Sequence, residues 1–117
     1  MFTFNHFNFN VLDLRRSLDF YAKALDLHPI RERKTDSYQL VFLGDGKTDF
    51  ALELTWLFDR TEPYDLGEQE FHLALTASDY EASYARHQAM GCVVQADSGR
   101  FYFIEDPDGY WIEILRG

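Results

Sequence analysis

The sequence has few cysteines and no long apolar run. Its 117 residues contain one cysteine, Cys92, which excludes an internal disulfide framework and a cysteine-rich zinc site. No stretch approaches the roughly 20 apolar residues of a membrane-spanning helix. The first residues, MFTFNH, lack the basic and apolar regions of a secretory signal. We therefore expect a cytoplasmic protein that does not span a membrane.

Basic residues are also scarce. Eleven Lys and Arg stand against 20 Asp and Glu, which gives a net charge of −9. This charge disfavours binding to nucleic acid or to an anionic membrane surface, and leaves metal cations and neutral small molecules as partners. Apolar residues make up 46% of the chain and aromatic residues 17%, enough for one compact folded domain.

The hydrophobic pattern predicts the same order of elements twice: a strand, a helix and three strands. A polar segment with Pro63 and Gly67, residues 59–68, is typical of a linker between the two halves. In the first half we expect a strand over 2–12, a helix over 14–25 capped by Asp13, and strands over 27–32, 38–43 and 50–57. In the second half we expect a strand over 71–77, a helix over 80–90 between Asp79 and Gly91, and strands over 92–96, 100–105 and 110–115.

Like residues recur between the halves at one offset. Three pairs stand 66 positions apart: His6 and His72, Asp13 and Asp79, and Ser17 and Ser83. Each half also ends in a strand with a glutamate between aliphatic residues, in Leu52-Glu53-Leu54 and Ile112-Glu113-Ile114. Three coincidences could arise by chance, but together with the matching order of elements they favour an internal duplication.

Each half thus carries one histidine and one glutamate on the strand face opposite its aliphatic residues. A carboxylate on the inner face of a curved sheet is costly unless it is paired or bound to metal. If both halves curve around a shared cavity, two imidazoles and two carboxylates converge: His6, Glu53, His72 and Glu113. This set suits Ni, Co, Zn, Mn or Fe(II) and leaves two coordination positions open for water or substrate.

Taken singly, these side chains have simpler interpretations. A lone strand glutamate usually lies on a solvated face, and a lone histidine is more often hydrogen-bonded structure than a ligand. We interpret the remaining candidates structurally: His28 as a loop residue, His87 as a helix-packing residue, Cys92 as a small buried hydrophobe, and the cluster at 31–34 as solvated surface. The repetition of the histidine and glutamate favours the metal.

The chain resembles the glyoxalase/bleomycin-resistance/dioxygenase group, the vicinal-oxygen-chelate superfamily. The similar segments are HFNFNVLDLRRSLDFYAKAL (6–25), LELT (52–55), YDLGEQEFHLAL (64–75) and FIEDPDGYWIEI (103–114). They are most similar to short bacterial glyoxalase I, the lactoylglutathione lyases. The resemblance implies one α+β domain over 1–117, in which two βαβββ modules, about 1–58 and 69–117, form an open cup around a metal with helices outside.

The resemblance also implies a function. His6, Glu53, His72 and Glu113 fall on the metal positions of glyoxalase I, a lyase or isomerase that acts through an enediolate on the hemithioacetal of a 2-oxoaldehyde and glutathione. Glu113 falls on the position of the proton-shuttling base and Glu53 on that of the second carboxylate. The metal would be Ni, Co or Zn, with Mn or Fe as alternatives. The Arg and Asn that serve glutathione in that family are replaced by Asn10 and Leu57, so another thiol or an unconjugated α-hydroxycarbonyl is an alternative substrate.

Two other functions fit the same fold: a metal-free drug- or metabolite-binding protein of the bleomycin-resistance type, and an Fe(II) dioxygenase. Two inward carboxylates disfavour the first, and the additional glutamate disfavours the second. We also expect a homodimer, because a lone chain would expose strand edges. By resemblance each metal would take His6 and Glu53 from one chain and His72 and Glu113 from the other, although the linker also permits closure within one chain.

Overall fold

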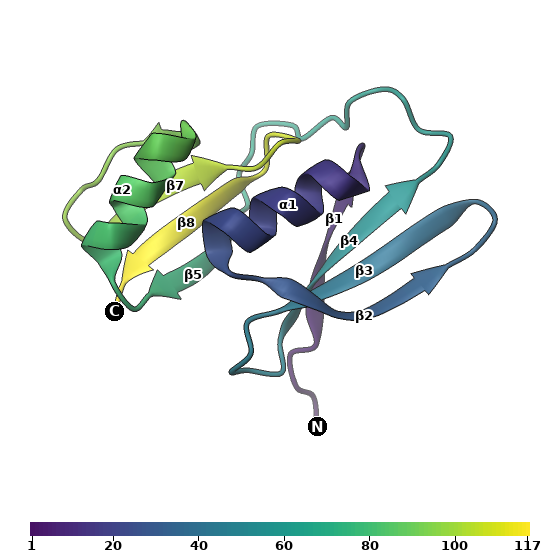
Figure 1. Ribbon diagram of the computed structural model, residues 1–117, viewed down its shortest axis with the longest axis horizontal. Coiled ribbons are helices and arrows are strands. Elements are labelled where there is room, and N and C mark those ends of the chain that lie inside the picture. The colour runs from purple at the N-terminus through teal and green to yellow at the C-terminus, as the bar shows by residue number, and fades with distance from the viewer. The chain divides into compact units, whose positions relative to one another are not determined.

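The computed structural model describes all residues, 1–117. The chain divides into two compact units, Met1–Tyr64 and Asp65–Gly117, called here the first and the second unit. The first unit contains β1 (His6–Val11), α1 (Leu14–Leu25), β2 (His28–Lys34), β3 (Tyr38–Gly44) and β4 (Ala51–Leu57). The second contains β5 (Leu73–Ala77), α2 (Tyr80–Met90), β6 (Val93–Gln95), β7 (Phe101–Glu105) and β8 (Trp111–Arg116) (Figure 1). The expected order of elements is confirmed in both units.

The two sheets have the same topology. The strand orders are β1-β4-β3-β2 and β5-β8-β7-β6. In each sheet the first strand runs parallel to the last strand of its unit, and the other neighbours are antiparallel. The boundary between the units, after Tyr64, lies within the polar segment 59–68. Each unit is therefore a βαβββ module, and the α+β fold predicted from the sequence is confirmed.

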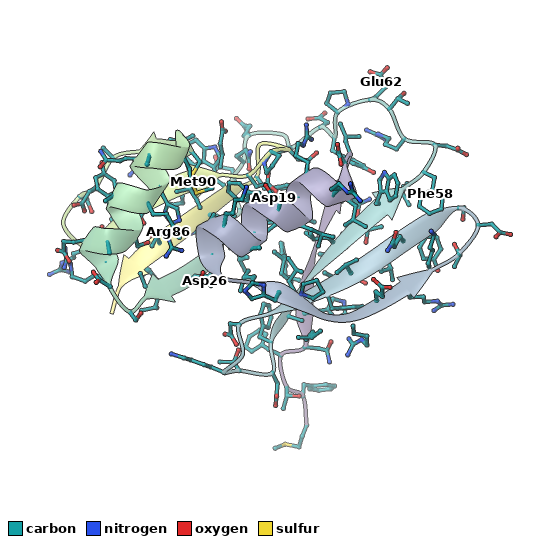
Figure 2. The ribbon with its side chains drawn as sticks, viewed as in Figure 1. Asp19, Asp26, Phe58, Glu62, Arg86 and Met90 are labelled. Carbon is teal, nitrogen blue, oxygen red and sulfur yellow. The ribbon has the colours of Figure 1, made fainter.

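Both helices begin and end as their capping residues dictate. The Asp13 carboxylate accepts from the Arg16 backbone N–H and the Asp79 carboxylate from that of Ala82, each at 3.1 Å. Gly91 ends α2 in the left-handed region, as its lack of a side chain allows. Asp26 ends α1 in the same way, with φ 54° (Figure 2). Neither helix is long and apolar enough to cross a membrane.

One face of each sheet is apolar and buried. In the first unit α1 packs against β2 and β4, and in the second α2 is hydrogen-bonded to β7 through Tyr102. Because strand side chains alternate between faces, the histidines and glutamates come to lie on the opposite face of each sheet. The core on the helix side consists of Phe9, Val11, Val41, Leu43, Leu52 and Leu54 in the first unit, and Tyr102, Ile104, Ile112 and Ile114 in the second.

Several strand ends differ from the expectation. The first strand begins at His6 rather than at residue 2, because its partner β4 begins at Ala51, opposite His6. His28 begins β2 opposite Gly44, so the prediction that it lies in a loop was wrong. Likewise β5 begins at Leu73 rather than at residue 71, and β6 has only three residues. These ends depend on the pairing partner rather than on local sequence.

Candidate metal centre

In the first unit, His6 lies beside Glu53. His6 begins β1 and Glu53 lies in the middle of β4, where it faces Asn8 across the parallel ladder. His6 Nε2 and Glu53 Oε1 are 3.6 Å apart, and the two side chains are 40% and 14% exposed. The imidazole is therefore accessible to solvent, while the carboxylate is largely enclosed by the sheet.

The second unit repeats this pair. His72 directly precedes β5, and Glu113 lies in β8 opposite Ala74. His72 Nε2 and Glu113 Oε1 are 3.2 Å apart, with 40% and 19% of the side chains exposed. In both units the histidine stands two residues before the residue that faces the glutamate. The duplication inferred from the sequence thus reproduces a side-chain contact as well as a topology.

A phenylalanine supports each pair. Phe42 faces Glu53 across the β3–β4 ladder, and Phe103 faces Glu113 across the β7–β8 ladder. Each ring meets the histidine of its unit edge-to-face, with ring centroids 5.4 Å apart in the first unit and 5.0 Å in the second. These contacts restrict the imidazole orientation, which favours a preformed ligand position.

Two amides support the pair of the first unit only. His6 Nδ1 donates to Asn5 Oδ1 at 2.6 Å, since an amide oxygen can only accept. This hydrogen bond fixes the proton on Nδ1 and leaves Nε2, the atom nearest Glu53, to bind a metal. The Asn8 amide lies 3.1 Å from Glu53 Oε1 and 2.5 Å from Thr55 Oγ1. In the second unit the corresponding positions are Phe71 and Ala74, which provide no side-chain hydrogen bond.

The donor atoms have separations that suit a shared ion. Two ligands about 2.1 Å from a metal lie about 3.0 Å apart at a right angle and about 3.4 Å apart at a tetrahedral angle. The observed 3.6 and 3.2 Å are close to these values. Within neither unit does a group of three or more His, Cys, Asp and Glu side chains gather that could hold a metal. Each unit thus brings together two of the four predicted ligands, and the assignment of all four to one ion stays a prediction.

The other candidate residues are structural. His87 is buried in α2, and its Nδ1 lies 2.7 Å from the Tyr102 hydroxyl, which confirms a packing role. Cys92 is buried as expected, and burial raises the pKa of its thiol. A thiol that resists ionisation in this way is a poor nucleophile and a poor metal ligand.

Sequence reasoning did not identify the residues that surround the histidines and glutamates. Phe42, Phe103, Asn5 and Asn8 were not singled out, because their contacts depend on strand pairing. One signal was available for the phenylalanines, which precede Glu53 and Glu113 by 11 and 10 residues, respectively.

Known proteins show the same fold and related sequences. The family model of the Glyoxalase/Bleomycin resistance protein/Dioxygenase superfamily matches residues 3–114. The chain belongs to this superfamily. A probable lactoylglutathione lyase of Vibrio parahaemolyticus is 33% identical over 95% of this chain and 88% of its own length. A lactoylglutathione lyase of Neisseria meningitidis is 35% identical over the same fractions.

Among solved structures, the glyoxalase I of Leishmania major, described as trypanothione-dependent, superposes with a TM-score of 0.86. The two are 32% identical, and the match covers 99% of this chain and 87% of that one. These relatives make the chain an enzyme of the lyase or isomerase class, of the glyoxalase I type. A protein of this type acts on small molecules and uses a divalent metal.

Proposed function

We propose that this protein is a cytoplasmic, divalent-metal-dependent lyase or isomerase. Its substrate is the hemithioacetal of a 2-oxoaldehyde and a thiol, or a related α-hydroxycarbonyl compound. The observation that carries the proposal is the repeated histidine–glutamate pair, with 3.6 and 3.2 Å between donor atoms. A protein that only binds an organic ligand has no need of two largely enclosed carboxylates, each beside an imidazole.

The four side chains His6, Glu53, His72 and Glu113 would hold the metal. Two imidazole nitrogens and two carboxylate oxygens form a donor set of intermediate hardness, which suits Ni, Co or Zn, with Mn or Fe as alternatives. When bound, the ion supplies a Lewis acid that increases the acidity of the substrate C1–H.

The glutamates carry out the proposed proton transfer. In the proposed reaction Glu113 removes the proton from C1, which gives an enediolate, and returns it to C2. Phe103 and Ala74 flank Glu113 on the neighbouring strands, and none of these side chains can donate a hydrogen bond to the carboxylate. Glu53, beside the Asn8 amide, is held in one orientation and is better suited to remain a ligand.

The proposal leaves open which thiol forms the hemithioacetal. Asn10 donates to the Tyr64 hydroxyl at 3.5 Å, and Leu57 is an exposed apolar side chain at the end of β4. The relatives described above are lactoylglutathione lyases and a trypanothione-dependent glyoxalase I. Asn10 and Leu57 occupy the positions at which the resemblance leads us to expect the glutathione-binding Arg and Asn. Several thiols must therefore be compared.

A homodimer is part of the proposal. β1 and β5 each have one neighbour in their sheets, so each leaves an edge without a partner strand in its own sheet. Each metal would take the His6–Glu53 pair from one chain and the His72–Glu113 pair from a second copy. Light scattering of the metal-loaded protein should give the mass of a dimer. A monomer that binds metal at full stoichiometry would show closure within one chain instead.

Metal reconstitution tests the proposed reaction. Metal is first removed from the protein with a chelator, and the protein is then reloaded separately with Ni, Co, Zn, Mn and Fe(II). Thioester formation is followed with methylglyoxal and several thiols. We expect turnover only after metal loading, and its loss in His6→Ala and His72→Ala. His28→Ala, which removes an exposed histidine of β2 outside both pairs, should keep activity. A metal-free protein that binds small molecules tightly but catalyses nothing would instead support the binding-protein function.

A further inference from the structure

His72 lies outside the ladder of its sheet. In the first unit His6 belongs to β1 and faces Ala51 of β4. In the second unit the pairing of β5 with β8 begins at Leu73, one residue after the histidine. The ladder that carries Glu113 therefore stops short of His72, and a contact outside it must set where the imidazole stands relative to the carboxylate.

The Gln69 side chain makes such a contact, three residues before His72. Its Nε2 donates a hydrogen bond to the backbone carbonyl of Gly109, in the turn that leads into β8. The register of β5 and β8, continued backward from Leu73, would put position 69 opposite position 108. The amide thus prolongs the parallel pairing at a point where no backbone ladder joins the two segments. From this hydrogen bond one segment runs three residues to His72, and the other runs four residues to Glu113.

The turn that accepts this hydrogen bond is itself held by several others. The Asp106 carboxylate is buried and accepts from the backbone N–H groups of Asp108 and Tyr110, each at 2.9 Å. The Gly109 N–H donates to the Asp106 carbonyl oxygen at 3.0 Å, and the Asp106 N–H donates to that of Tyr110 at 2.9 Å. Gln69 is therefore tied to a well-defined point of the second unit.

Gln69 makes this contact in an unfavourable conformation. Its φ is +57°, in the left-handed region, which among non-glycine residues only Asp26 at the end of α1 shares. Its Oε1 is buried without a hydrogen-bond partner, which costs free energy. Such features persist only where other contacts compensate for them, and they concentrate at functional sites. The compensating contacts here are the hydrogen bond to Gly109 and that from the Gln69 N–H to the Leu66 carbonyl, at 3.3 Å.

The first unit has no counterpart of this contact. Thr3 stands 66 positions before Gln69. It is exposed, and its side chain makes no hydrogen bond. His6 is fixed instead by the ladder and by the Asn5 amide. The two units thus hold equivalent imidazoles by different means.

We propose that Gln69 is a positioning residue of the metal centre. Its amide holds the segment that carries His72 against the turn that leads to Glu113. This hydrogen bond keeps His72 Nε2 and Glu113 Oε1 3.2 Å apart, so that both donor atoms are in place before an ion binds. The inference rests on the proposed function and adds to it a residue outside the ligand set.

Gln69→Met tests the role of the amide. Methionine has a similar length and loses both the donor and the unpaired oxygen, so the free energy of unfolding in urea should change little. The matched control is Thr3→Met, at the equivalent position of the first unit. In competition with a chelator, the affinity for Co(II) should fall about five- to tenfold in Gln69→Met and stay unchanged in Thr3→Met. The visible absorption of the Co(II) protein should change in Gln69→Met only.

Gln69→Gly separates the amide from the turn. Glycine adopts the left-handed conformation without strain but has no amide side chain. The affinity for Co(II) should therefore fall as it does in Gln69→Met. Wild-type affinity in Gln69→Gly would show that the backbone turn alone positions His72, and would overturn the proposal.

A measurement without metal separates this inference from the proposed function. The Phe103 ring meets the His72 ring edge-to-face, with centroids 5.0 Å apart, so it shifts the NMR signals of the imidazole protons. In Gln69→Met these signals should move toward those of free histidine, and in Thr3→Met they should not. If wild type binds no metal but the signals move, the proposed function fails and the positioning role stands. If wild type binds metal and Gln69→Met matches Thr3→Met in both affinity and signals, the positioning role is wrong and the metal centre stands.

Discussion

The two units share a strand topology and a cluster of one histidine, one glutamate and one phenylalanine, and they differ in the side chains around that cluster. In the first unit Asn8 faces Glu53 and Arg31 faces Phe42, so the face of the glutamate carries an amide and a guanidinium. In the second unit the same places hold Ala74 and Gln95. The histidine, glutamate and phenylalanine are common to both. What the units share is therefore the histidine–glutamate geometry, and what separates them is the polarity of the neighbouring side chains.

This difference indicates a division of labour. A carboxylate with an amide neighbour, as at Glu53, keeps its orientation and suits a permanent ligand. Glu113, between Ala74 and Phe103, has no amide neighbour and lies 3.2 Å from His72 Nε2. Under the proposed function it would move the proton. Under the proposed function, the duplicated module would assign metal retention to Glu53 and proton transfer to Glu113.

On the helix-packed faces the difference in polarity is reversed: here the second unit is the more polar one. At the position where the second unit buries Tyr102, opposite Ile114, the first buries Val41, opposite Leu54. The Tyr102 hydroxyl lies 2.6 Å from Ser83 Oγ and 2.7 Å from His87 Nδ1. The second unit therefore carries a polar group in its core, while the first carries its additional polar groups beside His6 and Glu53.

The largest expected effect tests the division between the glutamates. Glu113→Gln, saturated with metal, should lose about 10²–10⁴-fold in kcat, because it removes the proton-transfer group. Glu53→Gln should lower metal affinity at least as much and the chemical step less. Kinetics at measured full occupancy separate the two effects. Near wild-type turnover in metal-saturated Glu113→Gln would show that Glu113 is not the base.

Asn8→Ala should make the first unit resemble the second. It removes the amide beside Glu53, and loss of such a supporting group typically costs about tenfold or more in metal affinity. Competition with a chelator measures this affinity. The reciprocal variant, Ala74→Asn, places an amide beside Glu113 and should not lower affinity. Equal losses in both variants would contradict the asymmetry.

Tyr102→Phe should destabilise the fold by about 1–3 kcal/mol, because it removes the hydroxyl that lies between the buried His87 and the half-buried Ser83. The free energy of unfolding in urea measures this. Tyr38→Phe is the matched control in the first unit, since the Tyr38 side chain is half-buried and its hydroxyl makes no hydrogen bond. A Tyr102→Phe effect no larger than that of Tyr38→Phe would show that the polar cluster adds no stability.

The smallest effect concerns pH. The Tyr80 hydroxyl donates to Asp97 at 2.6 Å, and this hydrogen bond, with one from the Gly99 N–H, lowers the pKa of Asp97. A carboxylate with a lowered pKa in the folded state stabilises the fold above its unfolded pKa and loses that contribution as pH falls through the folded one.

Tyr80→Phe should therefore lose less stability than wild type between about pH 6 and about pH 3. Urea midpoints of the two proteins, measured across this pH range after metal has been removed with a chelator, give the difference in stability. Removing the metal eliminates any contribution from metal release. Parallel profiles for the two proteins would show that this hydrogen bond does not perturb Asp97.

Sequence reasoning reached the elements and the two faces of each sheet, since these follow from local signals. Asp13 and Asp79 marked the helix starts, and the alternation around Glu53 placed that side chain opposite Leu52 and Leu54. The strand ends at residues 2 and 71 were wrong because the partner strand decides where pairing begins.

Local sequence did not predict which residues surround the candidate ligands. The cluster at 31–34 was interpreted as solvated surface, and Arg31 is exposed. Strand alternation alone does not place Arg31 opposite Phe42, which depends on the bulge at Ile30. The contact between Phe42 and His6 likewise requires the register of three strands. Pairing across the sheet, rather than spacing along the chain, decides which side chains surround the candidate ligands.

The central claim is that the two pairs together hold one metal ion. Metal content per chain, measured after dialysis for wild type, His6→Ala and His72→Ala, tests it most directly. The claim predicts about one ion per chain in wild type and a large loss of metal in both variants, because each removes one imidazole from the same four-ligand set. Retention of metal by one variant at the wild-type level, or about two ions per chain in wild type, would show that the pairs act separately and would contradict it.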